Sequence, residues 1–158
     1  MDEDIENFLH DKAIEFLRRN WCSVYLLVNE QAFDEGHIKI DAYFTLSHKT
    51  LLPVSASKTS VKEASGFKGA ESVHFVLIGQ LGKYMERLSD GKIVSADISS
   101  KEILDCAFEV VRASSALIPC RCVLVECNSN EKVHKVYTDY HFKFFQFDGE
   151  HHQFYKPL

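Results

Sequence analysis

Residues 73–81 read Val-His-Phe-Val-Leu-Ile-Gly-Gln-Leu, a nearly continuous apolar run in the middle of the chain. An apolar run of this length without polar alternation is typical of a central strand that is covered on both faces. Gly79 and Gly82 interrupt its end, and glycine within a strand indicates a bulge or a close approach to the backbone. The run therefore predicts a buried central strand with an irregular last part.

The sequence after this strand predicts a crossover helix. Ser99 and Glu102 have the spacing of a capping box, and Pro119 ends the helix that we expect over residues 100–118. Residues 121–126 are the next expected strand, so the order strand, helix, strand predicts a parallel pair. We expect the core face of the helix to carry Ile103, Leu104, Ala107, Phe108, Val111 and Leu117.

The last part of the chain predicts one more helix and a hairpin. Asn128 with Glu131 is typical of a helix start. We expect that helix to turn Val133, Val136, Tyr137 and Tyr140 toward the core. Residues 142–147 and 153–156 are joined through Asp148-Gly149, which predicts a closing β-hairpin.

The first part of the chain predicts a helix and two antiparallel strands. Apolar residues at helical spacing predict a helix over residues 4–19, and β-branched or aromatic runs predict strands at 22–28 and 38–47. Residues 48–71 mix Pro, Ser, Lys and Gly and predict an excursion with at most a short helix. The whole pattern favours an α/β fold with a mixed sheet.

Composition favours one self-folding domain over residues 1–158. The chain is 46% hydrophobic and 12% aromatic, which is enough for a real core at this length. The beginning Met1-Asp2-Glu3-Asp4 is acidic, and no run approaches the roughly 20 apolar residues of a membrane span. Five cysteines, an odd number, suit reduced thiols. We therefore expect a cytoplasmic protein without a membrane partner.

Charge is distributed unevenly along the chain. The formal net charge of −5 opposes nonspecific binding to nucleic acid. Residues 1–36 carry nine acidic side chains against three basic ones, whereas residues 48–69 carry Lys49, Lys58, Lys62 and Lys68 against Glu63. The basic stretch is interpreted as a solvated loop or, less simply, as a docking surface for an anionic partner.

Cysteine and histidine near the end of the chain do not form a zinc motif. The residues in question are Cys120, Cys122, Cys127, His134 and His141. A Cys-x-Cys pair on a strand lacks the tight Cys-x2-Cys loop that closes on a metal. We therefore expect buried cysteines and no metal.

Three stretches of the sequence form a set of motifs. The first is Phe44-Thr-Leu-Ser47, the second is Val76-Leu-Ile-Gly-Gln-Leu-Gly-Lys83, and the third is Asn130 followed by Tyr137 and Phe142. Together they resemble the GNAT superfamily of N-acetyltransferases, and more closely its branch of small toxin-like acetyltransferases; the third is similar to the Asn-x6-Tyr and Gly-Phe pattern of that family. The resemblance implies a GNAT-like mixed central sheet with a splayed parallel strand pair and flanking helices.

The resemblance also implies acetyl-CoA as cosubstrate. In the family, backbone N–H groups beside the splay bind the pantetheine arm, and the start of the following helix binds the pyrophosphate. The residues that match these positions are Ile78, Gly79, Gln80, Leu81, Gly82, Lys83, Ser99, Ser100, Lys101 and Asn130. Three positions depart from the family pattern: Asp97 replaces Gln or Arg, Ser100 replaces a glycine, and His141 replaces the Gly of Gly-Phe.

In this family an amine attacks the thioester directly, and the resemblance makes Tyr137 the candidate acid for the departing thiolate. A phenol with a pKa of about 10 stays protonated at neutral pH and can still protonate a thiolate. A core tyrosine on a helix face is an equally weighted interpretation of Tyr137. The base stays open among Glu126, Glu71, Asp41 and water.

The resemblance implies an acetyl-CoA-dependent N-acetyltransferase whose acceptor is a small amine, a protein or an aminoacyl-tRNA. A tRNA partner and a homodimer are both open. The alternative is a noncatalytic GNAT-fold binding protein whose pyrophosphate loop has degenerated, and Asp97 and Ser100 favour it.

Overall fold

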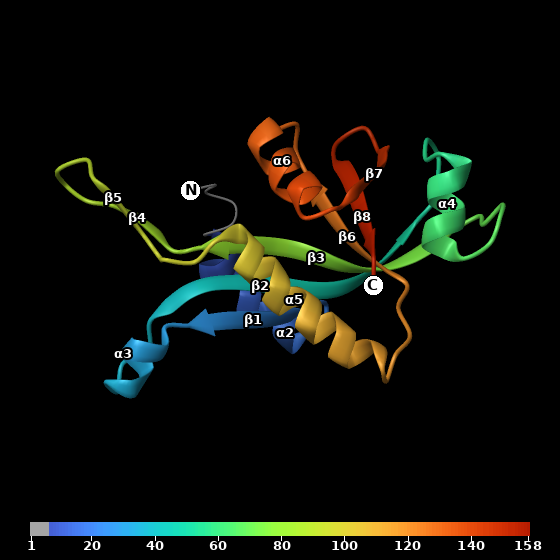
Figure 1. The fold of residues 1–158 in the computed structure, drawn as a ribbon. Helices are drawn as coiled ribbons and strands as arrows, with labels where there is room; N and C mark the ends of the chain where they lie inside the picture. Colours follow the sequence, from blue (N-terminus) through green and yellow to red (C-terminus); the bar gives the residue numbers. More distant parts are fainter. Residues whose placement is uncertain (1–6) are drawn as a thin grey trace. The chain divides into compact units, whose positions relative to one another are not determined.

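The computed structural model describes residues 7–158, which form two compact units (Figure 1). The first unit comprises the chain up to Leu46 together with Gln80–Cys106, and the second comprises Ser47–Gly79 and Ala107–Leu158. Three elements contribute residues to both units: β2 (Ile40–Leu51), β3 (Val73–Lys83) and α5 (Ser100–Ser115). No helix within residues 7–158 combines the length and the apolar composition that crossing a membrane requires.

The first unit begins with helix and continues with an antiparallel strand pair. A short π-helix η1 (Phe8–Lys12) leads directly into α2 (Ala13–Arg18), and β1 (Ser23–Val28) pairs antiparallel with β2. Phe8, Ala13 and Tyr43 form its small core, with the rings of Phe8 and Tyr43 stacked. The predicted first helix and strand pair are confirmed, although residues 4–6 of that helix lie outside the described residues.

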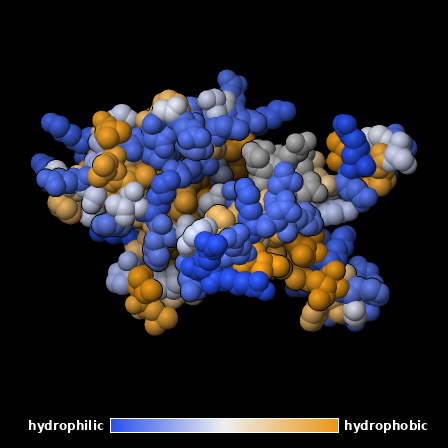
Figure 2. Space-filling view, turned by 180° about the vertical axis from the view of Figure 1, so that it is seen from behind, coloured by the Kyte–Doolittle hydropathy of each residue, from blue (hydrophilic) through white to orange (hydrophobic). Residues whose placement is uncertain are grey.

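One helix and one hairpin of the first unit lie where no element was predicted from the sequence. Helix α3 (Glu30–Asp34) follows β1, and the side chain of Asn29 caps it by accepting from the N–H of Ala32. Strands β4 (Met85–Arg87) and β5 (Ile93–Ser95) form an antiparallel hairpin beyond the end of β3 (Figure 1). In Figure 2 the projection at the lower right carries α3, and hydrophobic residues lie on the surface beside it.

The second unit contains the parallel pair and the closing hairpin. Its remaining elements are α4 (Lys58–Ser65), β6 (Cys122–Cys127), α6 (Glu131–Asp139), β7 (Lys143–Phe147) and β8 (His152–Pro157). β3 and β6 are parallel, whereas β8 pairs antiparallel with both β6 and β7. Hydrogen bonds order the strands β1-β2-β3-β6-β8-β7, so the mixed α/β sheet and its parallel pair are confirmed.

The core of the second unit lies between α4 and the strands of the sheet. Phe75, Leu124, Phe145 and Tyr155 are among its buried members, and Phe145 contacts Phe75 and Tyr155 edge to face. Such pairs add to the hydrophobic gain of burying large aromatic side chains.

Two details of the predicted helices are wrong. Leu117 is 86% exposed, because α5 ends at Ser115 and Leu117 lies in the turn that follows. The other expected core residues of α5, from Ile103 to Val111, are buried. The cap of α6 is Asn130 and not Asn128, because the Asn130 side chain accepts from the N–H of Lys132 at 3.0 Å.

His141 ends α6 in a left-handed conformation with φ of +67°. Its N–H donates to the carbonyl of Thr138, and the N–H of Phe142 donates to the carbonyl of Tyr137, both at 2.9 Å. This is the turn in which most helices place glycine, because a Cβ is strained there. The backbone at His141 therefore has the conformation that the expected Gly-Phe pattern requires.

We predict that His141→Gly raises the free energy of unfolding by about 1 kcal/mol. The substitution removes the strain of the left-handed backbone, and the greater conformational entropy of glycine in the unfolded chain offsets part of that gain. Urea denaturation at neutral pH measures the change. His141→Ala is the control: it removes the imidazole but keeps the Cβ, and it should give no gain. Equal stability of the two variants would show that backbone strain is not the cause.

Candidate functional site

The residues expected to bind acetyl-CoA, and the expected catalytic acid Tyr137, are distributed over both units. Gln80, Leu81, Gly82, Lys83, Ser99, Ser100 and Lys101 belong to the first unit, and Ile78, Gly79, Asn130 and Tyr137 belong to the second. Each group has its own local geometry, and each carries a different part of the expected chemistry.

In the first unit, the end of β3 contacts β2 through a hydrogen bond. The backbone N–H of Gln80 donates to the Thr45 hydroxyl at 2.9 Å, and Thr45 is only 3% exposed. Thr45 lies in the stretch Phe44-Thr-Leu-Ser47, so two of the stretches that resemble the GNAT pattern meet here. The hydroxyl satisfies an amide in the irregular part of the strand that would otherwise need another acceptor.

Lys83 links the end of β3 to the loop that precedes α5. Its ammonium donates to the carbonyl of Ile98 at 3.2 Å and to the carbonyl of Ala96 at 3.5 Å. The positive charge of Lys83 therefore lies beside the segment that leads into the helix N-terminus. A cation at this place is suited to an anionic ligand group such as a phosphate.

The N-terminus of α5 is closed by its own side chains. The Ser99 N–H and hydroxyl donate to the Glu102 carboxylate at 2.7 and 2.6 Å, and the Glu102 N–H donates to the Ser99 hydroxyl at 3.2 Å. The Ser99 hydroxyl and then its backbone N–H lower the pKa of Glu102. Lys101 pairs with Asp105 at 2.7 Å. The predicted capping box is confirmed, and the charge of Lys101 is already compensated.

A cavity of about 540 Å³ adjoins the end of β3 within the first unit. Its lining is mainly apolar and consists of Leu9, His10, Ile38, Lys39, Ile40, Ala42, Tyr43, Gly82, Lys83, Tyr84 and Met85. Burial raises the pKa of Tyr43 to about 12, so its phenol is neutral at physiological pH. A cavity of this size and character accommodates an apolar group beside Gly82 and Lys83.

Among the candidate bases, Asp41 has an unusual environment. Its Oδ2 accepts from the Asn29 amide at 2.8 Å, whereas Oδ1 is buried and has no hydrogen-bond partner among residues 7–158. The nearest cation is the Lys39 ammonium, 3.9 Å from Oδ1. Oδ1 of Asp41 is therefore a buried carboxylate oxygen whose hydrogen-bonding capacity is unused among residues 7–158.

In the second unit, the parallel pairing of β3 with β6 is short. It joins Val76 to Val123, Leu77 to Leu124 and Ile78 to Val125, and it ends there. β6 continues through Glu126 and Cys127, which pair on their other side with Gln153 and His152 of β8. Within the described second unit, the end of β6 is therefore paired on one side only, as the expected splay requires.

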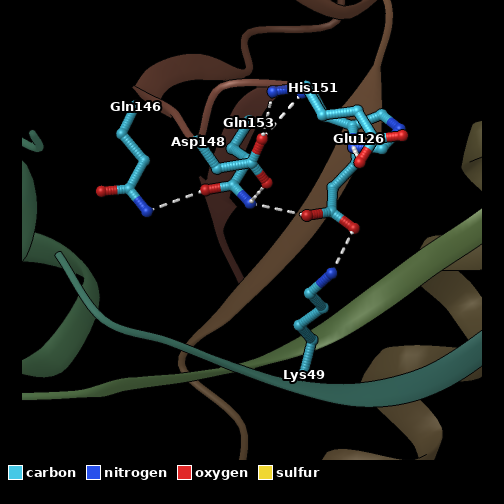
Figure 3. Close-up of polar contacts among 7 residues, drawn as sticks. Lys49, Glu126, Gln146, Asp148, His151 and Gln153 are labelled. Atoms are coloured by element: carbon cyan, nitrogen blue, oxygen red, sulfur yellow. Dashed lines mark hydrogen bonds and ion pairs between the residues drawn. The ribbon is translucent and has the colours of Figure 1, made fainter. Parts of the chain in front are cut away.

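Glu126 begins a network of polar side chains that joins four strands and the final turn (Figure 3). Its Oε2 accepts from Lys49 at 2.8 Å, and its Oε1 accepts from Gln153 at 2.6 Å. Gln153 also donates to Asp148 at 3.0 Å and accepts from Gln146 at 2.9 Å. Gln146 and Gln153 are buried, so their amides satisfy one another and the carboxylates.

This network makes Glu126 a weaker candidate for the catalytic base. Both carboxylate oxygens of Glu126 already accept hydrogen bonds, one of them from a cation. Neither Lys49 nor Gln153 was predicted from the sequence as a partner of Glu126. They are 77 and 27 residues away from Glu126 along the chain, and no local pattern indicates the contact.

Tyr137 lies on the inner face of α6 and is buried. Its ring contacts Phe142 and Phe154, with centroids 5.6 and 6.3 Å away. Burial raises the pKa of the phenol, and Cys127 raises it further. The hydroxyl makes no hydrogen bond to any residue that the structure describes. Tyr137 therefore has both a packing role and a neutral phenol with a proton to donate.

The cysteines are free thiols. Burial raises the pKa of Cys122 to about 12 and that of Cys127 to about 11, so both thiols are neutral at physiological pH. Within residues 7–158 no group of three or more His, Cys, Asp or Glu side chains could hold a metal ion.

Solved structures with the same fold give this arrangement a context. AtaT complexed with acetyl-methionyl-tRNAfMet matches with a TM-score of 0.72 and 18% identity, over 99% of this chain and 83% of that chain. A tyrosine-to-phenylalanine mutant of KacT matches with a TM-score of 0.74 and 18% identity, over 99% and 82%. This chain has the AtaT and KacT fold. AtaTR bound with acetyl-CoA also matches, with a TM-score of 0.70, 18% identity and coverage of 99% and 81%.

The fold expected from the GNAT resemblance is thereby confirmed. A scan against protein-family models matches none of them, and a search of curated proteins finds no match.

We predict that Gln153→Leu lowers the free energy of unfolding by about 2 kcal/mol, because it removes one partner from the buried Gln146 and one from the partly buried Glu126, whereas the exposed Asp148 can turn to water. Thermal and urea unfolding measure the loss. Lys135→Met is the control, since Lys135 forms an exposed pair with Asp139 and its loss should cost less than about 0.5 kcal/mol. A small effect of Gln153→Leu would mean that water replaces the amide without cost.

Proposed function

We propose that this protein is an acetyl-CoA-dependent N-acetyltransferase, with both units belonging to one domain over residues 1–158. The observation that carries the proposal is the early end of the β3–β6 pair at Ile78 and Val125, within a fold that solved acetyl-CoA complexes share. Such a splay leaves backbone donors for the pantetheine arm and the thioester carbonyl. The free thiols suit the cytoplasm, where we place the protein.

The proposed reaction is a direct transfer. The acceptor nitrogen, after losing a proton to a carboxylate or to water, attacks the thioester carbon, so a C–N bond forms and the C–S bond breaks. The CoA thiolate leaves and takes a proton from the Tyr137 hydroxyl, and the second proton of the acylated nitrogen then passes through solvent to restore the phenol. Burial raises the pKa of Tyr137, so its phenol is neutral at physiological pH and holds the proton that this step uses.

For the CoA phosphates we propose Lys83 as the main cation. Lys101 was expected to help, but its ammonium pairs with Asp105. Among the described residues Lys83 donates to carbonyl oxygens only, so its charge is not compensated by those contacts. At the start of α5, Ser100 offers its hydroxyl and its backbone N–H, whereas those of Ser99 already donate to Glu102.

The acceptor that we propose to test first is an aminoacyl-tRNA with an apolar side chain. The cavity beside Gly82 and Lys83 is lined mainly by apolar groups, which suits such a side chain better than a polyamine. One of the neighbouring structures holds acetyl-methionyl-tRNA. Small amines and protein N-termini complete the panel.

A noncatalytic binding protein is the second candidate function. The closed capping box favours it, because Glu102 occupies donors at the start of α5 that a pyrophosphate would use. The two functions differ in whether acetyl-CoA binds and turns over.

We predict that acetyl-CoA binds, and that at a hundred times Kd it raises the free energy of unfolding by about 2.7 kcal/mol. Lys83→Met should weaken binding about tenfold, because a charge-assisted phosphate contact is lost, whereas Lys101→Met should change it less than about twofold. Calorimetry measures both. S-acetylpantetheine, which lacks the phosphates, should bind both variants alike. No heat and no thermal shift at millimolar acetyl-CoA would favour the noncatalytic function.

We predict that Tyr137→Phe lowers kcat about a hundredfold while acetyl-CoA affinity changes less than about twofold, because the proton donor is lost and the ring still packs. Release of the CoA thiol on the acceptor panel measures turnover. Tyr155→Phe is the matched control: it loses a hydrogen bond to Glu63 and should keep its turnover. Wild-type turnover of Tyr137→Phe would remove Tyr137 from the mechanism.

A further inference from the structure

The second unit contains a small pocket with basic walls. Its volume is about 210 Å³, and the side chains of His48, His74, Arg121 and Phe67 are among its lining. None of the described residues that line this pocket is acidic. We call it the basic pocket, defined by His48, His74 and Arg121.

Arg121 is the central cation of this pocket. Its guanidinium lies against Gly66, where a Cβ would be only 3.3 Å from Cζ, Nε and Nη1. Gly66 ends α4 with φ of +91°, so the absence of a side chain both permits the turn and makes room for Arg121. The guanidinium forms no hydrogen bond or ion pair with another residue in the described part of the chain. Its donors are positioned but unused.

The two histidines add donors from the strands. The Nδ1 atom of His74 shares a hydrogen bond of 2.8 Å with the Thr50 hydroxyl, which fixes the ring and leaves Nε2 for a ligand. His48 is exposed on β2 and lines the same pocket. The imidazole rings of His48 and His74 and the guanidinium of Arg121 together offer several N–H donors to one anion.

The chain segment 58–68, which brings the end of α4 and Phe67 to the basic pocket, is also positive. Lys58 and Lys62 on α4 and Lys68 after it form no ion pair with a residue between 7 and 158. The acid between them, Glu63, is already compensated because it pairs with Lys143 and accepts from the Tyr155 hydroxyl at 2.6 Å. A segment with this charge fits an extended polyanion better than a single small anion.

The exposed ring of Phe67 indicates which class of polyanion fits the pocket. Its ring lines the pocket and is 60% exposed, which gives a flat apolar face beside the cationic groups. Bases of a single strand stack on such faces, whereas acidic side chains gain nothing from them. The volume of the pocket is below that of typical cofactor sites, so it suits one phosphate with the rest of the strand outside.

We propose that the basic pocket binds a phosphate of single-stranded RNA, with the neighbouring base stacked on Phe67. The guanidinium of Arg121 forms the main phosphate contact, His48 and His74 complete it, and the lysines of the segment 58–68 contact further phosphates of the strand. This site does not depend on the proposed acetyl transfer, because it needs neither acetyl-CoA nor Tyr137.

The test is fluorescence anisotropy of a labelled single-stranded RNA of about twelve nucleotides with the full chain at low salt. Arg121→Gln should weaken binding about tenfold and reduce the slope of log K against log salt by about 0.7. Phe67→Leu should weaken binding at least fivefold without changing that slope. Lys135→Gln, the control for loss of one exposed charge, should change affinity less than about twofold.

Two outcomes would overturn the proposal. One is wild-type affinity in both Arg121→Gln and Phe67→Leu, with their folding verified by unchanged thermal unfolding. The other is equal binding of poly-glutamate with no effect of Phe67→Leu, which would assign the pocket to an acidic peptide. Should Arg121→Gln fail to fold, Arg121→Lys replaces it, and loss of the bidentate contact should still weaken RNA binding at least threefold.

Discussion

The parallel pairing of β3 with β6 covers only three residues of each strand, and the second unit is arranged around the place where it ends. Among the described residues of the second unit, β6 pairs beyond Val125 with β8 only, so side chains must add to the stability there. Glu126 does so through its hydrogen bonds with Lys49 and Gln153. The end of β6 is thus held by a partly buried polar network in which the buried amides of Gln146 and Gln153 both have partners.

The start of α5 shows the opposite balance between stability and binding. A capping box stabilises the helix by satisfying its first amides, but the same amides are what an anion would need. The cation that stays available lies on the neighbouring strand end, at Lys83. Stability of the helix and affinity for phosphate therefore depend on different residues, and they can change separately.

Most of the fold could be predicted from the sequence, because periodicity and turn residues are local. The central strand, the capping box and the closing hairpin follow from such patterns. Helix α3 and the β4–β5 hairpin were missed because five- and three-residue elements are too short to show a period. The candidate site was harder to predict from the sequence. The family pattern names Tyr137 and Lys83, but the contacts of Gln80 with Thr45 and of Glu126 with Lys49 join residues that are far apart in the chain.

Strand β1 lies at the edge of the sheet, and its sequence Ser-Val-Tyr-Leu-Leu-Val carries no charge, proline or glycine. Natural edge strands usually carry such residues, because an open row of N–H and C=O groups invites another strand. Leu26 and Val28 are exposed on this strand. Self-association of the purified protein should therefore grow with concentration through intermolecular β-pairing, and a lysine on the solvent side of β1 is the natural way to keep concentrated samples monodisperse.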